Sequence, residues 1–476
     1  MSNVGRWTLI ASILGSSMAF IDGSVVNVAL PFMAHDFGVG LSSMQWVVSA
    51  YLLMLGALIL VGGSLGDIFG ELRMFGIGVA AFGVASVLCA FAPDATTLIV
   101  FRGVQGVAGA LLTPTSLAVL TATFTGAERG AAIGQWTAWS GISFVIGPLV
   151  GGSLIDATSW RVIFGINVPI ALFTLGLVMR LGGMKEKRRT DLRVDFRGAL
   201  LCVTGLGLLV TGFIEQPSRG WSDPLVAGGL AAGAALLAAF VVYELRAPMP
   251  MLPLHLFSLR NFSVTNVETL SVYGALSGLS VFLTLFLIEF SHYSALRAGA
   301  ALLPITVVMF FLSPRTGKLS MAIGPRWFMA LGPVIAGVAV LDYSRLPAHP
   351  GYWLDLLPAL LVFSVGLSLT VAPLTTTVLA DATADNAGEA SGVNNAVARV
   401  GGLLAVAILG ITASSGSTHL TTSGFHRTML AVAVLLMAGG VIGGVGIRNP
   451  SRARQLDPDG AVGVDDERQS ETVASP

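Results

Sequence analysis

Residues 7–32 read WTLIASILGSSMAFIDGSVVNVALPF, an apolar run whose single charged side chain is Asp22. A helix needs about 20 mostly apolar residues to cross the hydrocarbon core of a bilayer. Backbone polar groups in lipid must pair within their own segment, so such a run must be helical. The run is too long for the apolar part of a cleavable signal peptide, and further apolar runs follow it. This stretch therefore predicts a first membrane-spanning helix.

The same pattern recurs along all 476 residues, of which 54% are hydrophobic and only 11% are charged. Soluble domains carry about 25% charged residues. Lys+Arg and Asp+Glu both total 26, so the chain has no net charge and no basic footprint for nucleic acid. We predict an all-α membrane protein with fourteen spans: residues 7–32, 44–64, 73–92, 96–121, 131–154, 162–182, 197–215, 224–244, 262–289, 297–313, 327–343, 353–378, 393–413 and 428–447.

The basic residues orient the predicted helices. If the N-terminus lies inside the cell, the cytoplasmic segments hold 18 Lys and Arg residues and the outer loops hold five. Cytoplasmic loops of membrane proteins carry such an excess. We therefore predict a multi-pass protein of the cell membrane with both termini in the cytoplasm. The basic cluster at residues 185–189 is interpreted as a loop that sets this topology, with a lipid-headgroup or regulatory patch as the alternative.

The spacing Gly-x-Leu-x4-Gly is the same in the segments that start at Gly63 and at Gly317, and in both cases a basic residue follows shortly after, Arg73 or Arg326. Duplicated halves are typical of transporters, whose substrate site lies between the halves near the midplane of the membrane. We expect four parts: an N-terminal six-helix bundle (residues 1–182), loops with two additional helices (183–261), a C-terminal six-helix bundle (262–447) and a disordered cytoplasmic tail (448–476).

Asp22 is a candidate functional residue because charged side chains inside a membrane are costly and usually functional. It lies roughly 22 Å along its helix, at about 1.5 Å per residue. Burial disfavours the charged form of a carboxyl, so a buried one can take up and release a proton. It can also attract a cationic substrate. The alternative is a carboxyl that pairs with a structural donor.

Other charges also fall within the predicted spans. Arg102 stays protonated and needs an acceptor or an aqueous cavity, so it either tunes a nearby carboxyl or anchors backbone carbonyls. Glu268 and Glu289 lie near opposite ends of the ninth span, where each is a candidate for proton transfer or a solvated interfacial group. Arg399, near the start of the thirteenth span, is interpreted as a structural or snorkelling residue.

Residues 147–152 read GPLVGG, late in the fifth span. Pro148 lacks a backbone N–H and kinks a helix. Gly147 and Gly151 form a small-residue face that permits close helix packing. A kink at a close contact can serve as a pivot or a seal, and ordinary packing is the alternative.

Several other chemistries have no signature in the sequence. Gly317-Lys318 is followed by Leu319 rather than Ser or Thr and lacks the upstream glycine of a phosphate-binding loop, which argues against ATP-driven pumping. All six histidines fall in predicted loops, and both cysteines lie in apolar runs with no metal-binding spacing. We therefore expect neither an enzyme nor a metal or cofactor site, with a proton gradient as the energy source.

Five motifs together resemble one family. They are residues 22–31 in the first span, 63–73 after the second, 98–109 around Arg102, 141–152 in the fifth span, and 160–169 with its Trp-Arg and Asn-Val-Pro. In these residues the chain resembles the major facilitator superfamily, in particular its fourteen-span drug:proton antiporter branch. The resemblance covers about residues 7–447. It implies two six-helix bundles plus two additional central helices.

The resemblance also implies roles for individual residues. Residues 98–109 match the family motif linked to proton coupling, and residues 63–73 match a cytoplasmic gate motif. The matching gate residues are Gly63, Asp67, Gly70 and Arg73, whereas Ile68, Glu71 and Leu72 stand where the family usually carries basic residues. The fifth-span motif marks exporters in the family, and its matching residues are Gly141, Gly147, Pro148, Gly151 and Gly152. Glu289 stands where the family commonly has Gln.

These observations predict a monomeric exporter that exchanges external protons for a small hydrophobic or cationic drug. Asp22 would lie between two rocking bundles, load a proton outside and discharge it inside, while Asp67 and Arg73 would stabilise one closed state. The first alternative is a dedicated exporter of one metabolite, such as a self-made antibiotic or a siderophore. An importer or facilitator is a further alternative, and a membrane enzyme or receptor is disfavoured because no catalytic cluster or soluble domain is evident.

Overall fold

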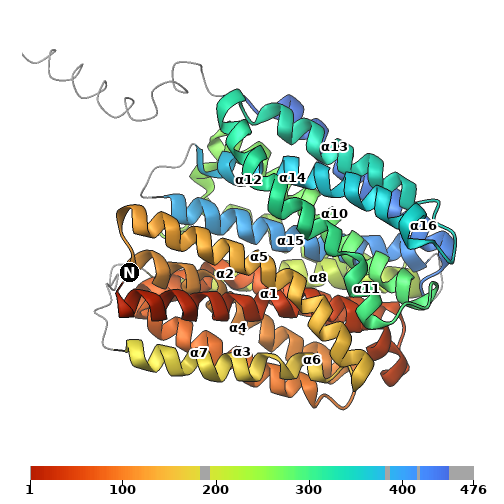
Figure 1. The fold of residues 1–476 in the computed structure, drawn as a ribbon, viewed down its shortest axis with the longest axis horizontal. Helices are drawn as coiled ribbons and strands as arrows, with labels where there is room; N and C mark the ends of the chain where they lie inside the picture. The colour runs from red at the N-terminus through yellow and green to blue at the C-terminus, as the bar shows by residue number, and fades with distance from the viewer. Residues whose placement is uncertain (1, 183–192, 381–385, 415–418, 450–476) are drawn as a thin grey trace, which may run out of the picture.

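The computed structural model describes residues 2–182, 193–380, 386–414 and 419–449, and these residues are largely helical (Figure 1). Fourteen helical stretches within those ranges are long and apolar enough to cross a membrane, which confirms the predicted number of spans. The basic cluster at residues 185–189 and most of the predicted tail lie outside the described residues.

The helices extend a few residues beyond most of the predicted spans. They are α1 (Asn3–Phe37), α2 (Leu41–Phe69), α3 (Glu71–Ala90), α4 (Ala95–Thr123), α5 (Gly126–Ala157), α6 (Val162–Gly165), α7 (Asn167–Leu181), α8 (Phe196–Arg219), α9 (Pro224–Glu244), α10 (Arg260–Glu289), α11 (Ala295–Ala301), α12 (Leu303–Ile323), α13 (Arg326–Tyr343), α14 (Leu357–Ala380), α15 (Ala387–Ser414) and α16 (Thr422–Gly446), with a 3₁₀ turn at Leu254–Ser258 and a π-helical turn at Tyr352–Leu356.

The tenth span is longer than predicted and is broken. It runs over Ala295–Ile323, and the break between α11 and α12 falls at Leu302. Pro304 near the start of α12 has no backbone N–H to donate to the preceding turn. The sixth span is broken in a similar way between α6 and α7, next to Pro169.

The helices form two bundles that lie one above the other in Figure 1. The N-terminal bundle (α1–α7) is built from contacts of α1 with α5, of α2 with α4, and of α3 with α4 and α7. The C-terminal bundle (α10–α16) is built from contacts of α10 with α15 and α16, and of α14 with α12 and α13. We call the end where α1 begins the predicted cytoplasmic end, and the opposite end the predicted outer end.

The most extensive contact between the two bundles is a seam between α2 and α15. At the predicted outer end, Gln45 donates from Nε2 to the carbonyl of Val406 at 2.5 Å. A Cβ on Gly392, toward the predicted cytoplasmic end, would lie 3.2 Å from the side chain of Leu60. The seam therefore runs along most of both helices and ties the bundles together.

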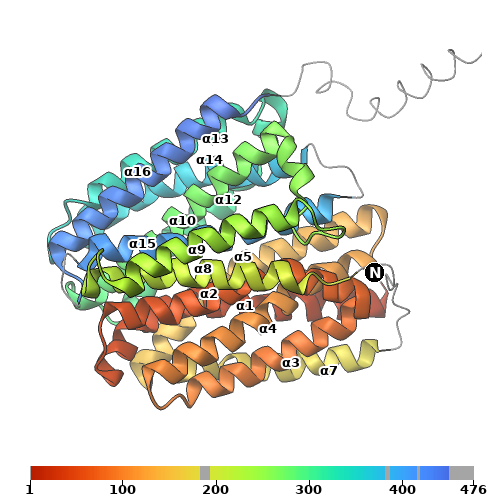
Figure 2. The same ribbon diagram turned by 180° about the vertical axis from the view of Figure 1, so that it is seen from behind.

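The two additional helices are central in the sequence but peripheral in space. Figure 2 shows α8 and α9 lying across the outside of the seam, and α8 contacts both α2 and α15. An apolar cluster joins the three helices, with Leu206 and Val210 of α8 packed among Leu53 of α2 and Leu403 of α15. The hairpin formed by α8 and α9 thus covers the seam on one side of the molecule. It makes no cover on the opposite side, which faces the viewer in Figure 1.

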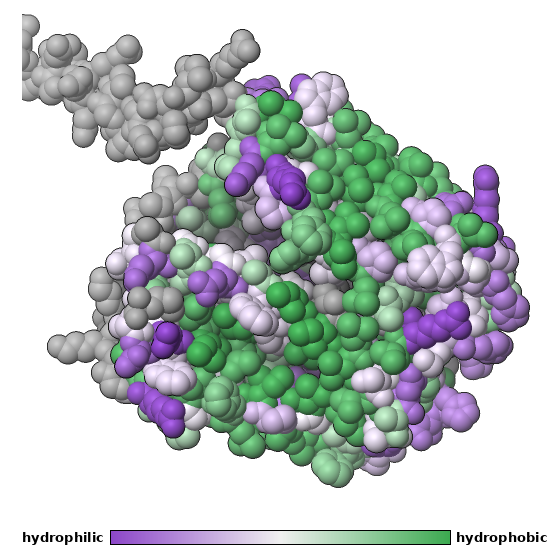
Figure 3. Space-filling model, in the orientation of Figure 1, coloured by the Kyte–Doolittle hydropathy of each residue, from purple (hydrophilic) through white to green (hydrophobic). Residues whose placement is uncertain are grey.

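The surface fits a bilayer. Figure 3 shows a broad apolar band over the outer faces of the helices, with polar residues gathered toward the two ends. Large apolar side chains such as Leu172 and Phe173 of α7, and Phe310 and Phe311 of α12, point outward. Apolar surface of this extent does not face water in monomeric soluble proteins.

The duplicated glycine pattern adopts the same backbone at both sites. Gly70 and Gly324 have φ values of 104° and 94°, and each donates its N–H back to the residue four positions earlier, Gly66 or Ser320. Side chains disfavour this region because Cβ clashes with the backbone. The repeat is therefore a structural one, a tight helix-to-helix turn at the predicted cytoplasmic end of each bundle.

We expect Gly70→Ala to lower the stability of the protein by about 1–3 kcal/mol, because this backbone conformation is essentially restricted to glycine. Thermal unfolding in detergent measures the change. Gly63→Ala is the matched control, since Gly63 is helical and a Cβ there would lie 3.8 Å from Pro114. Equal effects of the two substitutions would contradict the strain at Gly70.

Candidate functional site: a buried charge network

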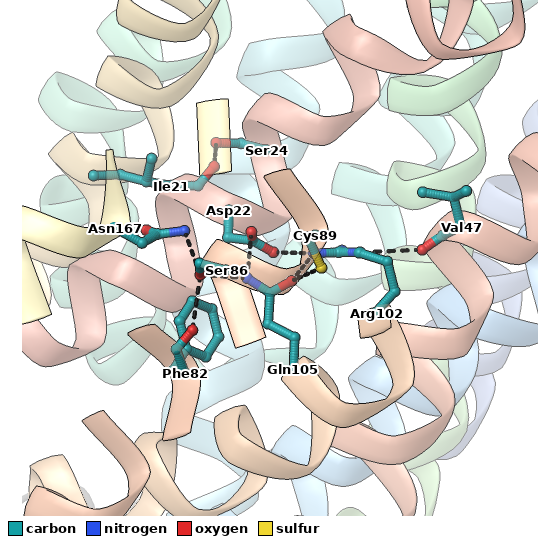
Figure 4. A network of polar contacts seen from close by, with 10 residues as sticks. All are labelled: Ile21, Asp22, Ser24, Val47, Phe82, Ser86, Cys89, Arg102, Gln105 and Asn167. Atoms are coloured by element: carbon teal, nitrogen blue, oxygen red, sulfur yellow. Dashed lines mark hydrogen bonds and ion pairs between the residues drawn. The ribbon is translucent and has the colours of Figure 1, made fainter. Parts of the chain in front are cut away.

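Asp22 and Arg102 form an ion pair inside the N-terminal bundle. Arg102 Nη1 lies 2.5 Å from Asp22 Oδ2, and both side chains are 1% exposed. Gln105, three residues after Arg102 and thus on the same face of α4, accepts from Arg102 Nη1 at 2.6 Å and donates to Asp22 Oδ1 at 2.9 Å. Figure 4 shows the three side chains closing a ring between α1 and α4.

The ring is held by further polar groups from neighbouring helices. Ser86 of α3 accepts from Gln105 Nε2 at 2.9 Å and from Asn167 of α7 at 3.2 Å (Figure 4). Arg102 Nε donates to the carbonyl of Val47 on α2 at 3.2 Å, and its guanidinium lies 4.4 Å from the ring centroid of Tyr51. Helices α2, α3 and α7 thus add contacts to the network that α1 and α4 form.

Arg102 makes the contacts that both of its predicted roles need, because its guanidinium binds a carboxyl and also a backbone carbonyl. Each oxygen of Asp22 accepts a hydrogen bond. A buried ion pair is tolerated only when such additional hydrogen bonds compensate for the lost hydration. Any event that neutralises Asp22 would therefore leave Arg102 without its counter-charge.

The expectation that Asp22 lies between the two bundles was wrong. Its hydrogen-bond partners, Arg102 and Gln105, both come from α4 of the N-terminal bundle. The sequence could not show this, because one face of α1 is as apolar as another and hydropathy alone does not indicate how a helix is rotated. A change at Asp22 can reach the other bundle through the neighbouring helices, since α1 contacts α10 and α2 contacts α15.

Glu268 and Glu289 are not part of this network. Glu268 of α10 is fully buried in the C-terminal bundle, and neither of its carboxyl oxygens has a hydrogen-bond partner among the described residues. Its carboxyl carbon would lie 3.0 Å from a Cβ on Gly443 of α16, so it points toward α16. Glu289 is the last residue of α10 and is exposed at the predicted outer end, as expected for a solvated interfacial group.

Glu268→Met is expected to raise the stability of the protein by about 1–3 kcal/mol, because it removes buried polar atoms that have no partner while keeping most of the volume. The unfolding temperature in detergent measures this. Glu215→Met is the control, since Glu215 forms an exposed pair with Arg219 of the kind that contributes about 0–1 kcal/mol. A loss of stability in Glu268→Met would contradict an unpartnered carboxyl.

The fifth-span motif lies where α5 contacts α1 and α11. Gly147 and Gly151 face α1, where a Cβ on Gly147 would be 3.0 Å from the carbonyl oxygen of Ile21. Gly152 faces α11, where a Cβ would be 2.7 Å from the carbonyl oxygen of Ala295. The small-residue face thus makes the close helix contacts predicted for it.

Helix α11 also has a glycine at this contact with α5. A Cβ on Gly299 would lie 2.6 Å from the carbonyl oxygen of Pro148, so both helices need glycine here. Gly141 differs from the rest of the motif, because no atom lies within 4 Å of a Cβ built on it. The close contact between α5 and α11 is therefore confined to the predicted outer end.

Asp156 was missed in the sequence. This residue near the end of α5 accepts from the backbone N–H groups of Ala295 at 2.9 Å and Leu296 at 3.0 Å, in the first turn of α11. A carboxylate at a helix N-terminus is stabilised by the unpaired N–H groups and the helix dipole. No local pattern could reveal it, because its partners lie in the other bundle. Asp156 thus fastens the two bundles together at the predicted outer end.

The gate motif lies at the opposite end of the molecule, where α2 meets α3. Gly63 and Asp67 lie on the last turns of α2, Gly70 forms the turn, and Arg73 lies on the first turn of α3. The chain turns here because Gly70 adopts a positive φ. The role of these four residues as a cytoplasmic gate stays a prediction.

Arg399 is not near a membrane surface. Because α15 begins at Ala387, earlier than the predicted span, Arg399 lies near the middle of this helix. Its Cβ would be 3.1 Å from a Cβ on Gly56, which places it at the seam between α2 and α15. A snorkelling side chain needs a helix end, so the position of Arg399 contradicts snorkelling, whereas a structural role stays a prediction.

A family model for the Major Facilitator Superfamily matches residues 12–406. The chain belongs to this superfamily. It is 36% identical to the puromycin resistance protein of Streptomyces alboniger over 87% of the chain and 82% of that protein. It is 33% identical to the tetracenomycin C resistance and export protein of Streptomyces glaucescens over 86% of the chain and 76% of that protein.

Solved transporter structures share the fold. A mutant of the peptide transporter POT superposes with a TM-score of 0.69 at 14% identity and covers 93% of both chains. The superfamily member described here is thus a multi-pass membrane protein of a transporter family, in agreement with the resemblance found in its motifs.

Proposed function

We propose that this superfamily member exports small amphipathic drugs or antibiotics from the cell in exchange for protons. The relatives support the cargo, because the two named above are described by resistance to, or export of, an antibiotic. The observation that carries the mechanism is the ion pair of Asp22 and Arg102. It places an ionisable carboxyl, that of Asp22, inside the membrane-spanning part of the chain.

The network supplies a way for a proton to act on conformation. Protonation of Asp22 removes its negative charge and weakens its bond to Arg102, whose guanidinium then depends on Gln105 and on the carbonyl of Val47. Val47 lies on α2, the helix that forms the seam with the other bundle. A ligand that binds one conformation better than another shifts the balance between them, and the proton would act as such a ligand.

The arrangement of the bundles supports an inward-open state in the predicted orientation. Gly152, Gly299 and Asp156 hold α5 against α11 at the predicted outer end. Toward the predicted cytoplasmic end, Cβ atoms built on Gly134 and Gly141 of α5 would meet nothing within 4 Å. Figure 1 shows α5 and α12 diverging in that direction, and Figure 3 shows the surface hollowed between the bundles there. Alternating access would close this end and open the other.

Transport into everted membrane vesicles tests the proposal. In these vesicles the cytoplasmic side faces outward, so an exporter accumulates drug inside when the lumen is acidic. We expect the uptake of puromycin and ethidium to require the protein and to collapse when a protonophore dissipates the pH gradient. Uptake that is indifferent to the gradient would contradict proton exchange, and uptake only into right-side-out vesicles would indicate an importer.

Export of one metabolite is the second candidate. The two relatives named above favour it in one respect, since each of these two is named for a single antibiotic. A resistance panel separates the two candidates. Cells that produce the protein should tolerate several unrelated amphipathic drugs if it is a multidrug exporter, and one chemical class if it is a dedicated exporter.

A further inference from the structure

Arg399 is a cation in the middle of the membrane-spanning region for which the described residues provide no counter-charge. It forms no hydrogen bond or ion pair with any of them, and its buried Nε has no acceptor. A charged side chain at this depth normally faces a cavity and pairs with an acceptor. Arg102, which is fully buried, shows how completely such a group can be satisfied in this protein.

The surroundings of Arg399 explain why its charge stays unbalanced. Two uncharged groups lie within electrostatic range of its guanidinium, the phenol hydroxyls of Tyr51 on α2 and Tyr273 on α10. Asp22 is already bound by Arg102. Glu268 points away, toward Gly443 of α16. No carboxylate among the described residues therefore serves Arg399.

The position of Arg399 fits a substrate contact. It lies where α2 of one bundle meets α15 of the other, and its side chain is only partly buried. Transporters of this architecture bind substrate between their halves near the midplane. A guanidinium presents a planar fork of donors that matches a carboxylate with two parallel hydrogen bonds.

We propose that Arg399 binds the carboxylate of amphipathic substrates that carry an acidic group. The inference rests on the proposed export function and narrows its cargo, since the sequence favoured hydrophobic or cationic molecules. The carboxylate would give the buried Nε of Arg399 an acceptor.

Two dyes that differ by one group test this subsite in the purified full-length protein. Rhodamine 19 carries a free carboxylate, and rhodamine 6G is its ethyl ester with the same cationic ring system. We expect wild-type protein to bind rhodamine 19 about tenfold more tightly, as measured by fluorescence anisotropy, because the charge-assisted hydrogen bonds are lost with the ester. A small inorganic anion at Arg399 would instead help both dyes equally and give no preference.

Variants at Arg399 test whether this residue causes the preference for rhodamine 19. Arg399→Gln should abolish it by weakening rhodamine 19 binding about tenfold while leaving rhodamine 6G unchanged, and Arg399→Lys should retain part of it. Arg180→Gln is the control, since Arg180 is exposed near the end of α7. Equal affinity of wild-type protein for both dyes, no measurable binding of either, or a preference that survives in Arg399→Gln would each overturn the subsite.

Proteoliposomes separate this inference from the export proposal. If rhodamine 19 binds with the expected preference but a pH gradient drives neither dye, the export proposal fails while the subsite stands. If the gradient drives both dyes equally in wild-type protein and in Arg399→Gln, the export proposal stands and the subsite is overturned.

Discussion

Asp22→Asn is expected to reduce proton-driven drug uptake in everted vesicles to the level of vesicles that lack the protein. An amide cannot take up and release a proton, so the step that couples the gradient to the conformation is lost. The substitution also leaves Arg102 buried without its counter-charge. Removal of one partner of a buried ion pair costs about 3–5 kcal/mol, so the unfolding temperature in detergent should fall as well.

A double-mutant cycle separates the loss of coupling from the loss of stability. Arg102→Gln alone leaves Asp22 uncompensated and should destabilise the protein to a similar degree. The double variant Asp22→Asn/Arg102→Gln carries no buried charge, so it should recover most of the stability. It should still fail in proton-driven uptake. Full proton-driven uptake by Asp22→Asn, at normal levels of protein in the membrane, would remove Asp22 from the coupling mechanism.

Gly152→Leu is expected to abolish transport by preventing closure at the predicted outer end. A Cβ at this position would lie 2.7 Å from the carbonyl oxygen of Ala295, and the obstruction is backbone that cannot move aside like a flexible side chain. The wedge would push α5 from α11 and break the two hydrogen bonds that Asp156 accepts there. The protein would then stay open at that end.

A reporter cysteine makes the opening measurable. Ser280 of α10 accepts a hydrogen bond from Asn27 of α1 at 3.0 Å, across the interface between the bundles. Ser280→Cys should be labelled faster by a membrane-impermeant maleimide, added outside intact cells, when Gly152→Leu is also present. The native Cys89 and Cys202 are buried, and the parent protein reports their background. Gly141→Leu is the matched control in the same helix, where a Cβ meets no atom within 4 Å. Equal labelling in both variants would contradict a seal at Gly152.

The candidate site shows which functional features local sequence patterns can predict and which they cannot. The sequence indicated Asp22 and Arg102 individually, because a charge in an apolar run is conspicuous wherever it lies. It could not show that the two meet, because they are 80 residues apart and come from different helices. Nor could it show that Glu268 lacks a partner or that Arg399 lies at the seam, since both depend on which side of a helix faces which neighbour.

The sequence by itself determined the membrane class and the fourteen spans. Both follow from a local rule: an apolar run long enough to cross the bilayer must be helical. Only the tertiary structure decided which charges pair, that Asp22 lies within one bundle, and that α8 and α9 lie outside the seam. The physical reason is that lipid is as apolar as a helix interface, so hydropathy does not distinguish the face a helix turns to the membrane from the face it packs against its neighbours.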